Sequence, residues 1–185
     1  MSSPSTTVSR WHFLLHRWPT ALGLAVAILS LVTGSNQESL AITLAVAAVC
    51  YLAAAALGEP WTVWPAVLGA SLVVVVSELI GIPWWAGLGG TAVVLVLVGL
   101  ALRVSRSALL AQALAVVGFG GVAMIAVFST PQVGVIVGGL ALASHAIWDV
   151  IHLRRKLVVA PSLAEACIFL DVPLGLGLIV IAFVN

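Results

Sequence analysis

Residues 40–57 read LAITLAVAAVCYLAAAAL and contain no charged side chain. A helix of about 20 apolar residues crosses the hydrocarbon core of a bilayer, so this stretch predicts a transmembrane helix. The other apolar runs of the chain are comparable and are separated by turn-forming or charged residues. We therefore expect seven transmembrane helices, near Pro19–Thr33, Leu40–Leu57, Val63–Ile80, Trp84–Leu102, Ala108–Phe128, Val133–Ile151 and Leu163–Val184.

The composition of the whole chain leads to the same interpretation. The 185 residues are 63% hydrophobic and 7% charged, with a mean hydropathy of +1.27, whereas a soluble domain carries about 25% charged residues. Apolar runs without alternation favour helices over a membrane β-barrel. We expect an all-α membrane helix bundle, with residues 1–18 as a cytoplasmic interfacial segment and residues 19–185 as a single transmembrane domain.

The composition also excludes several classes of protein. Lysine and arginine together number 7, too few for a nucleic-acid partner. Both cysteines lie inside apolar runs, which argues against a disulfide framework. A retinal protein needs a lysine in its last helix, but the sole lysine, Lys156, lies in a predicted loop. Haem ligation is also disfavoured, because His12 and His16 precede the first span.

The basic residues predict the orientation in the membrane. If the N-terminus is cytoplasmic, seven spans place every basic residue on the cytoplasmic side, as the positive-inside rule requires. These residues are Arg10, Arg17, Arg103, Arg106, Arg154, Arg155 and Lys156. We therefore expect a multi-pass protein of the inner (plasma) membrane whose C-terminal residue, Asn185, lies outside.

Polar residues are densest in the sixth predicted helix, over the sequence SHAIWDVIH at residues 144–152. At about 100° per residue, His145, Asp149 and His152 share one helix face. Asp171 in the next helix reaches about the depth of His145, and a short link makes the two helices neighbours. Ionisable residues inside a membrane are costly and mark functional sites. Asp171, Asp149 and His145 are therefore the predicted catalytic residues.

Further polar and aromatic residues belong to the same half of the membrane. The predicted substrate-binding residues are Trp148, Tyr51, Trp64, Phe169 and Gln112. We expect them around a cytoplasm-facing pocket within the membrane, between the second, third, sixth and seventh helices, with Trp148 lining the cavity. Pro173 is expected to bend the last helix beside Asp171, because it lacks the N–H for a helical hydrogen bond.

Some of these residues also have a purely structural interpretation. His152 can be explained as an interfacial residue beside Arg154. Asp149 can be explained as the ion-pair partner of an arginine in the loop that contains Arg154. Cys167, one turn before Asp171, fits a small core residue. His145 and Asp171 resist this interpretation, because they are the two deepest ionisable residues and come from adjacent helices.

Acid–base catalysis is the first of three chemistries open to this cluster. A carboxylic acid in a poorly solvated site can hold a proton at neutral pH, and a neighbouring histidine can orient it and resupply the proton. Aromatic ring faces can stabilise a transient cation. These groups suit protonation of an alkene or epoxide and the cyclisation or isomerisation of an isoprenoid. The small membrane-bound terpene cyclases are similar in architecture.

The other two chemistries are metal-assisted hydrolysis and transport. His145, Asp149 and Asp171 with one water match the ligand number of a catalytic divalent metal such as zinc. Alternatively, a chain of histidine and aspartate side chains can relay protons in a transporter or bind a cation. The polar residues crowd into one half of the membrane, however, which favours a one-sided pocket over a through-pathway.

Three motifs resemble those of a group of uncharacterised small actinobacterial integral membrane proteins. They are Glu59–Pro65 (EPWTVWP), the His-x-x-Trp-Asp-x-x-His pattern of His145–His152, and the Cys-x-x-x-Asp pattern of Cys167–Asp171. The resemblance implies a seven-helix membrane protein and brings no activity with it. We expect a membrane enzyme acting on a lipid or isoprenoid, with a metal-dependent hydrolase or a proton-coupled transporter or binding protein as alternatives.

Overall fold

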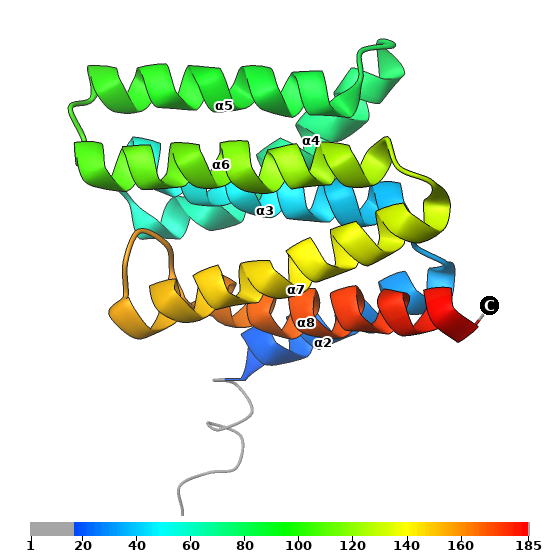
Figure 1. Ribbon diagram of the computed structural model, residues 1–185. Coiled ribbons are helices and arrows are strands. Elements are labelled where there is room, and N and C mark those ends of the chain that lie inside the picture. The colour runs from blue at the N-terminus through cyan, green and yellow to red at the C-terminus, as the bar shows by residue number, and fades with distance from the viewer. Residues whose placement is uncertain (1–16, 185) are drawn as a thin grey trace, which may run out of the picture.

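The protein is an all-helical bundle in the computed structural model, which describes residues 17–184 (Figure 1). In this part of the chain there are seven α-helices and one 3-10 turn, so the predicted fold class is confirmed. The elements are α2 (Trp18–Thr33), α3 (Gln37–Leu57), η1 (Pro60–Thr62), α4 (Val63–Leu79), α5 (Trp84–Ala101), α6 (Arg106–Val127), α7 (Pro131–Arg155) and α8 (Pro161–Val184). Most of the predicted interfacial segment, residues 1–16, and Asn185 lie outside the described residues.

Six of these helical segments are long and apolar enough to cross a membrane: α3, residues 60–79 including α4, α5, α6, α7 and α8. The chain is therefore a multi-pass helical membrane protein. The first helix, α2, is also apolar but contains only 16 residues. At about 1.5 Å per residue it is roughly 24 Å long, somewhat shorter than a bilayer core of about 30 Å.

Local sequence signals set the ends of the first helices. Gly34 and Gly58 end α2 and α3 with φ of 85° and 71°, a left-handed conformation that glycine adopts without steric cost. Asn36 begins α3 by accepting hydrogen bonds from the backbone N–H groups of Glu38 and Ser39, each at 3.0 Å. This capping supplies partners to amides that the helix itself leaves free.

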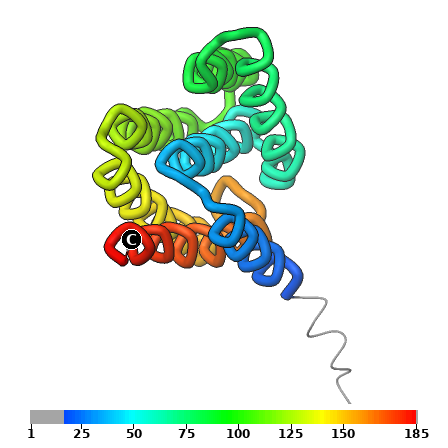
Figure 2. Tube along the Cα trace, turned by 90° about the vertical axis from the view of Figure 1, so that its right-hand side faces the viewer, coloured from blue at the N-terminus to red at the C-terminus, as the bar shows by residue number. Residues whose placement is uncertain are grey.

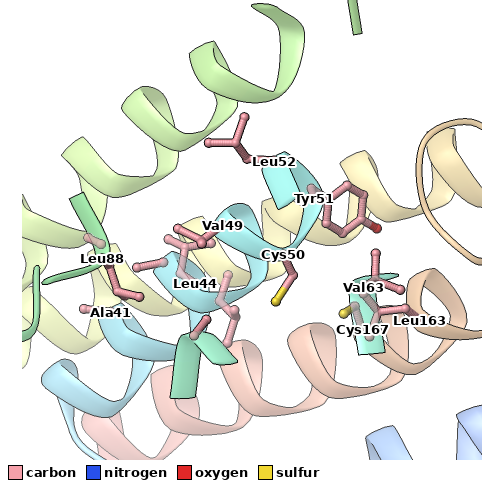
Figure 3. Close-up of a cluster of buried hydrophobic side chains, with 14 of the residues drawn as sticks. Ala41, Leu44, Val49, Cys50, Tyr51, Leu52, Val63, Leu88, Leu163 and Cys167 are labelled. Atoms are coloured by element: carbon pink, nitrogen blue, oxygen red, sulfur yellow. The ribbon is translucent and has the colours of Figure 1, made fainter. Parts of the chain in front are cut away.

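The centre of the bundle is α3, which packs against α4, α5, α6 and α7. Figure 2, a view along the helices, shows α3 between the two halves of the molecule. Its side chains Leu44, Val49 and Leu52 are buried in the apolar core, and Figure 3 shows this cluster, with Cys167 of α8 nearby. The outer helix α2 packs along α8. The core therefore encloses the middle of α3 and leaves α2 at one edge.

Close backbone contacts bring α8 against two other helices. A Cβ atom added at Gly175 would lie 2.5 Å from the carbonyl oxygen of Gly139 in α7, so these helices touch at both glycines. Gly23 of α2 similarly faces the backbone of Ala166 and Leu170. Pro173 lies inside α8, and the helix continues through it. These contacts position the polar side chains of α7 and α8.

The charged residues are distributed unevenly between the two ends of the bundle. The linkers after α3, α5 and α7 lie at the same end, on the left in Figure 1. We call it the basic end, because it carries every basic residue among residues 17–184: Arg17, Arg103, Arg106, Arg154, Arg155 and Lys156. Arg17 is placed there by its ion pair with Glu165, at the start of α8 (3.2 Å).

Candidate active site

His145, Asp149 and Asp171 form one buried cluster. Nδ1 of His145 lies 3.0 Å from Oδ2 of Asp171 and 3.3 Å from Oδ2 of Asp149. His145 and Asp149 are one turn apart on α7, while Asp171 comes from α8, and all three side chains are inaccessible to water. The expected direct contact between the polar faces of these two helices is therefore present.

Tyr51 of α3 is a fourth member of this cluster. Its hydroxyl donates a hydrogen bond of 2.5 Å to Oδ1 of Asp149, and the tyrosine is completely buried. The Tyr51 ring also stands edge-on to the rings of His145 and His152, with centroids 5.6 Å and 5.0 Å apart. Tyr51, predicted to bind substrate, thus binds Asp149 and lies outside the lining of the cavity beside Asp171.

His152, Gln112 and Trp148 form a second polar group, nearer the basic end. The indole N–H of Trp148 can only donate, and it donates to Oε1 of Gln112 at 3.2 Å. The amide nitrogen of Gln112 therefore donates to Nε2 of His152 at 2.9 Å. His152 then carries its proton on Nδ1, which donates to the carbonyl oxygen of Trp148 at 2.8 Å.

This second group corrects the interfacial interpretation of His152. The side chain is only 4% exposed and has a hydrogen-bond partner on each ring nitrogen. The predicted alternative partner of Asp149, an arginine of the adjacent loop, is likewise replaced by His145 and Tyr51. Each donor and acceptor of the group has a partner inside the bundle, so the group is suited to joining α6 to α7.

Three atoms of the His–Asp cluster have no hydrogen-bond partner. They are Nε2 of His145, Oδ2 of Asp149 and Oδ1 of Asp171, and all three are buried. The His145 ring stands at 71° to the ring of Phe119, with centroids 4.8 Å apart. Buried polar atoms without partners are costly and call for an explanation. Of the three residues, Asp171 also lines a cavity.

The cavity beside Asp171 has a volume of about 780 Å³ and is bordered by α2, α3, η1, α4 and α8. Its walls are mainly apolar and include Leu22, Cys50, Trp64, Leu68 and Cys167 in addition to Asp171. On α4 and α8 the lining residues belong to the first half of each helix, which begins at the basic end. Volumes of about 300–1,000 Å³ are typical of small-molecule sites.

The position of this cavity differs from the expectation. We predicted a pocket between the second, third, sixth and seventh helices, but α2 forms the wall that was assigned to α7. The physical reason is that the polar face of α7 packs directly against α3, α6 and α8. Asp171 alone connects the His–Asp cluster to the cavity.

Of the predicted substrate-binding residues, Trp64 lines the cavity. Trp148 and Gln112 bind each other, and Phe169 is 36% exposed, away from the cavity lining. Cys50 also lines the cavity, although no sequence motif marks it. A possible sequence signal for the contribution of α2 is Gly23, a residue that permits close packing in an otherwise apolar helix.

The cluster also offers a set of metal ligands. One ligand atom from each of His145, Asp149 and Asp171 lies within 4.8 Å of the others. Three such ligands with a water are the arrangement of a catalytic zinc site. A metal-binding histidine usually donates its second ring N–H to a carboxylate or carbonyl, whereas Nε2 of His145 has no such partner. The donor set thus fits a metal, but its outer support is incomplete.

The fold and site together define a multi-pass helical membrane protein with a buried His–Asp cluster beside an apolar cavity. Comparisons of the chain with protein-family models, curated proteins and solved structures gave no match. A functional assignment therefore depends on the chemistry of the site.

Proposed function

We propose that the protein is a membrane-embedded enzyme that carries out acid–base chemistry on a lipid or isoprenoid substrate. The observation that carries this proposal is the position of Asp171. One carboxylate oxygen contacts His145, the other is buried without a hydrogen-bond partner, and the residue lines the apolar cavity. A positioned acid beside a small-molecule cavity is the minimum that proton-transfer catalysis requires.

The proposed reaction begins with transfer of a proton from the carboxylic acid of Asp171 to a carbon–carbon double bond or an epoxide oxygen. With a double bond, its π electron pair forms the new C–H bond. With an epoxide, a lone pair of the oxygen forms the new O–H bond and one C–O bond breaks, so the oxygen becomes a hydroxyl group. In both cases a carbocation remains. Loss of a proton from a neighbouring carbon to the Asp171 carboxylate forms a new double bond and restores the acid. The net reaction is an isomerisation or cyclisation and needs no co-reactant.

The remaining members of the cluster act on Asp171 indirectly. His145 orients the carboxyl group through the 3.0 Å contact to Nδ1, and Oδ2 of Asp149 lies 3.3 Å from the same nitrogen. Tyr51 fixes Asp149 in turn. His145 is therefore a positioning residue that can also return a proton to Asp171, while Trp61 and Trp64 supply ring faces along the cavity.

The distribution of buried polar side chains supports an enzyme over a transporter. Among residues 17–184, the fully buried polar or charged residues are Thr62, Ser77, Gln112, His145, Asp149, His152 and Asp171. Only Ser77, near the end of α4, lies toward the end opposite the basic loops. A conducted ion or proton would need polar groups along the rest of its path. A site accessible from one half of the bundle is the simpler interpretation.

We also propose that α2 crosses the membrane and that the basic end is cytoplasmic, in the inner (plasma) membrane. Six described basic residues gather at that end, and the linkers at the opposite end, residues 34–36, 80–83 and 128–130, contain none. This asymmetry follows the positive-inside rule. The proposal gives seven spans, with the C-terminus outside.

A metal-dependent intramembrane hydrolase is the second candidate function. The observation that favours it is the set of ligand atoms from His145, Asp149 and Asp171 within 4.8 Å. A divalent ion held there would activate a water for hydrolysis. The acid–base proposal ranks first, because it uses the unpartnered oxygen of Asp171 and requires no second partner for His145.

Lipid analysis of cells that differ only at Asp171 tests the proposed function. Membranes of cells producing the native protein should contain a product that is isomeric with its precursor. In Asp171→Asn cells the precursor should accumulate, because the amide keeps the shape of the side chain but cannot act as the acid. Glu78→Gln is the control, since Glu78 is exposed near the other end of α4. Identical lipids in native and Asp171→Asn membranes would contradict the proposal.

A further inference from the structure

We infer that the substrate is an uncharged, single-chain lipid that enters the cavity sideways from the bilayer, between α2 and α4. This inference rests on the proposed function and names the substrate class of the same site. It depends on where the cavity opens, on which charges line it, and on the free oxygen of Asp171.

The gap between α2 and α4 is the lateral opening of the cavity. α2 packs along α8, with Gly23 against the backbone of Ala166 and Leu170, so the α8 side of α2 is closed. On its other side, Leu22 of α2 and Leu68 of α4 line the cavity and are 42% and 74% exposed. Figure 2 shows α2 and α4 on the same side of the bundle, with α3 nearer its centre. The rim is therefore apolar and faces the acyl chains of the bilayer.

Contacts at the basic end narrow the entry from that side. The rings of Trp18 in α2 and Trp64 in α4 are 5.1 Å apart and bridge the gap between these helices. The indole N–H of Trp64 donates to Oγ of Ser162 in α8 at 3.2 Å, and the backbone N–H of Ala160, just before α8, donates to the carbonyl oxygen of Pro60 in η1 at 3.0 Å. Because all three contacts lie at the end that faces the proposed cytoplasm, entry from the side of the bilayer avoids them.

The charges along the cavity exclude a phosphorylated substrate. A phosphate or diphosphate group is usually held by arginine, lysine or a bound cation. No lysine or arginine lines the cavity within the described part of the chain. A lipid headgroup with a net negative charge is therefore a poor fit for this cavity.

Asp171 gives the bound lipid its orientation. Asp171 lines the cavity and its Oδ1 is buried without a hydrogen-bond partner, so this carboxyl group suits a hydroxyl, an epoxide oxygen or a polarisable double bond on the substrate. The rest of the lining is apolar and suits a hydrocarbon chain. With about 780 Å³ available, the cavity matches a small, single-chain molecule such as a linear isoprenoid alcohol.

An accessible thiol in the cavity lining provides a direct test. Cys50 and Cys167 are the only cysteines of the chain and both line the cavity, but both are buried and therefore poorly reactive. Val26 also lines the cavity and is 40% exposed, so Val26→Cys supplies the thiol. In lipid nanodiscs, membrane-soluble N-ethylmaleimide should add one adduct to Val26→Cys, detected by intact-mass measurement, whereas a charged, membrane-impermeant methanethiosulfonate should not react. Saturating geranylgeraniol should slow the maleimide reaction at least tenfold. Geranylgeranyl diphosphate at the same concentration should leave the rate unchanged.

A pair of variants controls for the route of entry. In the Val26→Cys protein, Ser71→Phe fills the cavity and should abolish modification. Leu72→Phe adds the same ring at an exposed neighbour outside the lining, so it should leave the reaction of Val26→Cys unchanged. Modification by the charged reagent, equal protection by the diphosphate, or no protection by geranylgeraniol would overturn the inference.

The labelling experiment reports occupancy without requiring turnover. Loss of protection in a protein whose Asp171→Asn variant still alters membrane lipids would overturn the substrate class and leave the proposed function intact. If protection is retained but Asp171→Asn leaves the membrane lipids unchanged, the proposed function is overturned and the substrate class stands. Native mass spectrometry of Ser71→Phe should also show less bound geranylgeraniol than Leu72→Phe, which checks the inference independently of thiol reactivity.

Discussion

His145 and Asp171 face each other across the interface between α7 and α8, with Nδ1 of the histidine 3.0 Å from Oδ2 of the carboxylate. Both side chains are shielded from water, the second oxygen of Asp171 has no hydrogen-bond partner, and Asp171 lines an apolar cavity. The contact thus connects the interface between α7 and α8 to a cavity that can hold a small molecule. Its geometry depends on how closely the two helices approach.

Gly175→Ala should impair the site by separating α7 from α8. The new Cβ would lie 2.5 Å from the carbonyl oxygen of Gly139, a backbone atom that cannot rotate away. Overpacking of this kind costs about 1–3 kcal/mol, and the shift should weaken the contact between His145 and Asp171. Thermal unfolding in detergent and product formation in membranes should both decrease.

Gly118→Ala is the matched control, because no atom lies within 4 Å of a Cβ added at Gly118. Alanine is a better helix former than glycine by up to about 1 kcal/mol, so this variant should be at least as stable as the native protein. Equal behaviour of the two variants would contradict the proposed backbone contact.

Gln112→Leu should lower stability and leave catalysis largely unchanged. The substitution removes the partners of the Trp148 indole N–H and of Nε2 of His152, both in the second polar group. Leaving one buried polar group without a partner costs about 1–3 kcal/mol. The midpoint of thermal unfolding should therefore decrease clearly.

The control for this variant is Gln132→Leu at the exposed beginning of α7, where surface substitutions change stability by about 0.5 kcal/mol or less. If Gln112→Leu abolishes product formation at temperatures where the protein is folded, the second polar group belongs to the catalytic machinery.

Metal removal separates the two candidate functions. With acid–base chemistry, treatment with a chelator should leave both the unfolding temperature and product formation unchanged. With a metal centre, elemental analysis should find one divalent ion per chain that is lost in His145→Ala and in Asp171→Ala. Chelation should then also lower the unfolding temperature, because metal binding contributes to folding free energy.

A pair of reporter fusions checks the orientation. A green fluorescent protein fused after Asn185 should stay dark when exported, while alkaline phosphatase at the same position should be active. Fusions after Lys156, in the linker between α7 and α8, should give the reverse result. A fluorescent fusion at Asn185 would mean that α2 does not cross the membrane and that the chain has six spans.

The fold could be predicted from the sequence because apolarity over a fixed length is a local property. The ends of the helices were less accurate. α3 begins at Gln37 and not at Leu40, because Asn36 provides the cap. α7 continues to Arg155, four residues past the expected Ile151, since charged side chains are tolerated where a helix leaves the membrane.

The candidate site could be predicted only in part. The spacing of His145 and Asp149 on one helix, and the depth of Asp171 on the next, were sufficient to bring these three together. The hydrogen bond from Tyr51 to Asp149 depends on how α3 is rotated toward α7. The wall formed by α2 depends on a contact between helices that are distant in sequence. Neither rotation nor pairing of distant helices follows from hydropathy.

The packing of α2 against α8 also constrains the order in which the site is assembled during synthesis. Among the described helices, α2 leaves the ribosome first and α8 last, so their contact joins segments separated by most of the chain. Such a contact has a high sequence separation and forms late. Until α8 is inserted, the nascent chain lacks both Asp171 and the surface that holds α2 in place. The site is therefore completed in a single step, when α8 enters the membrane.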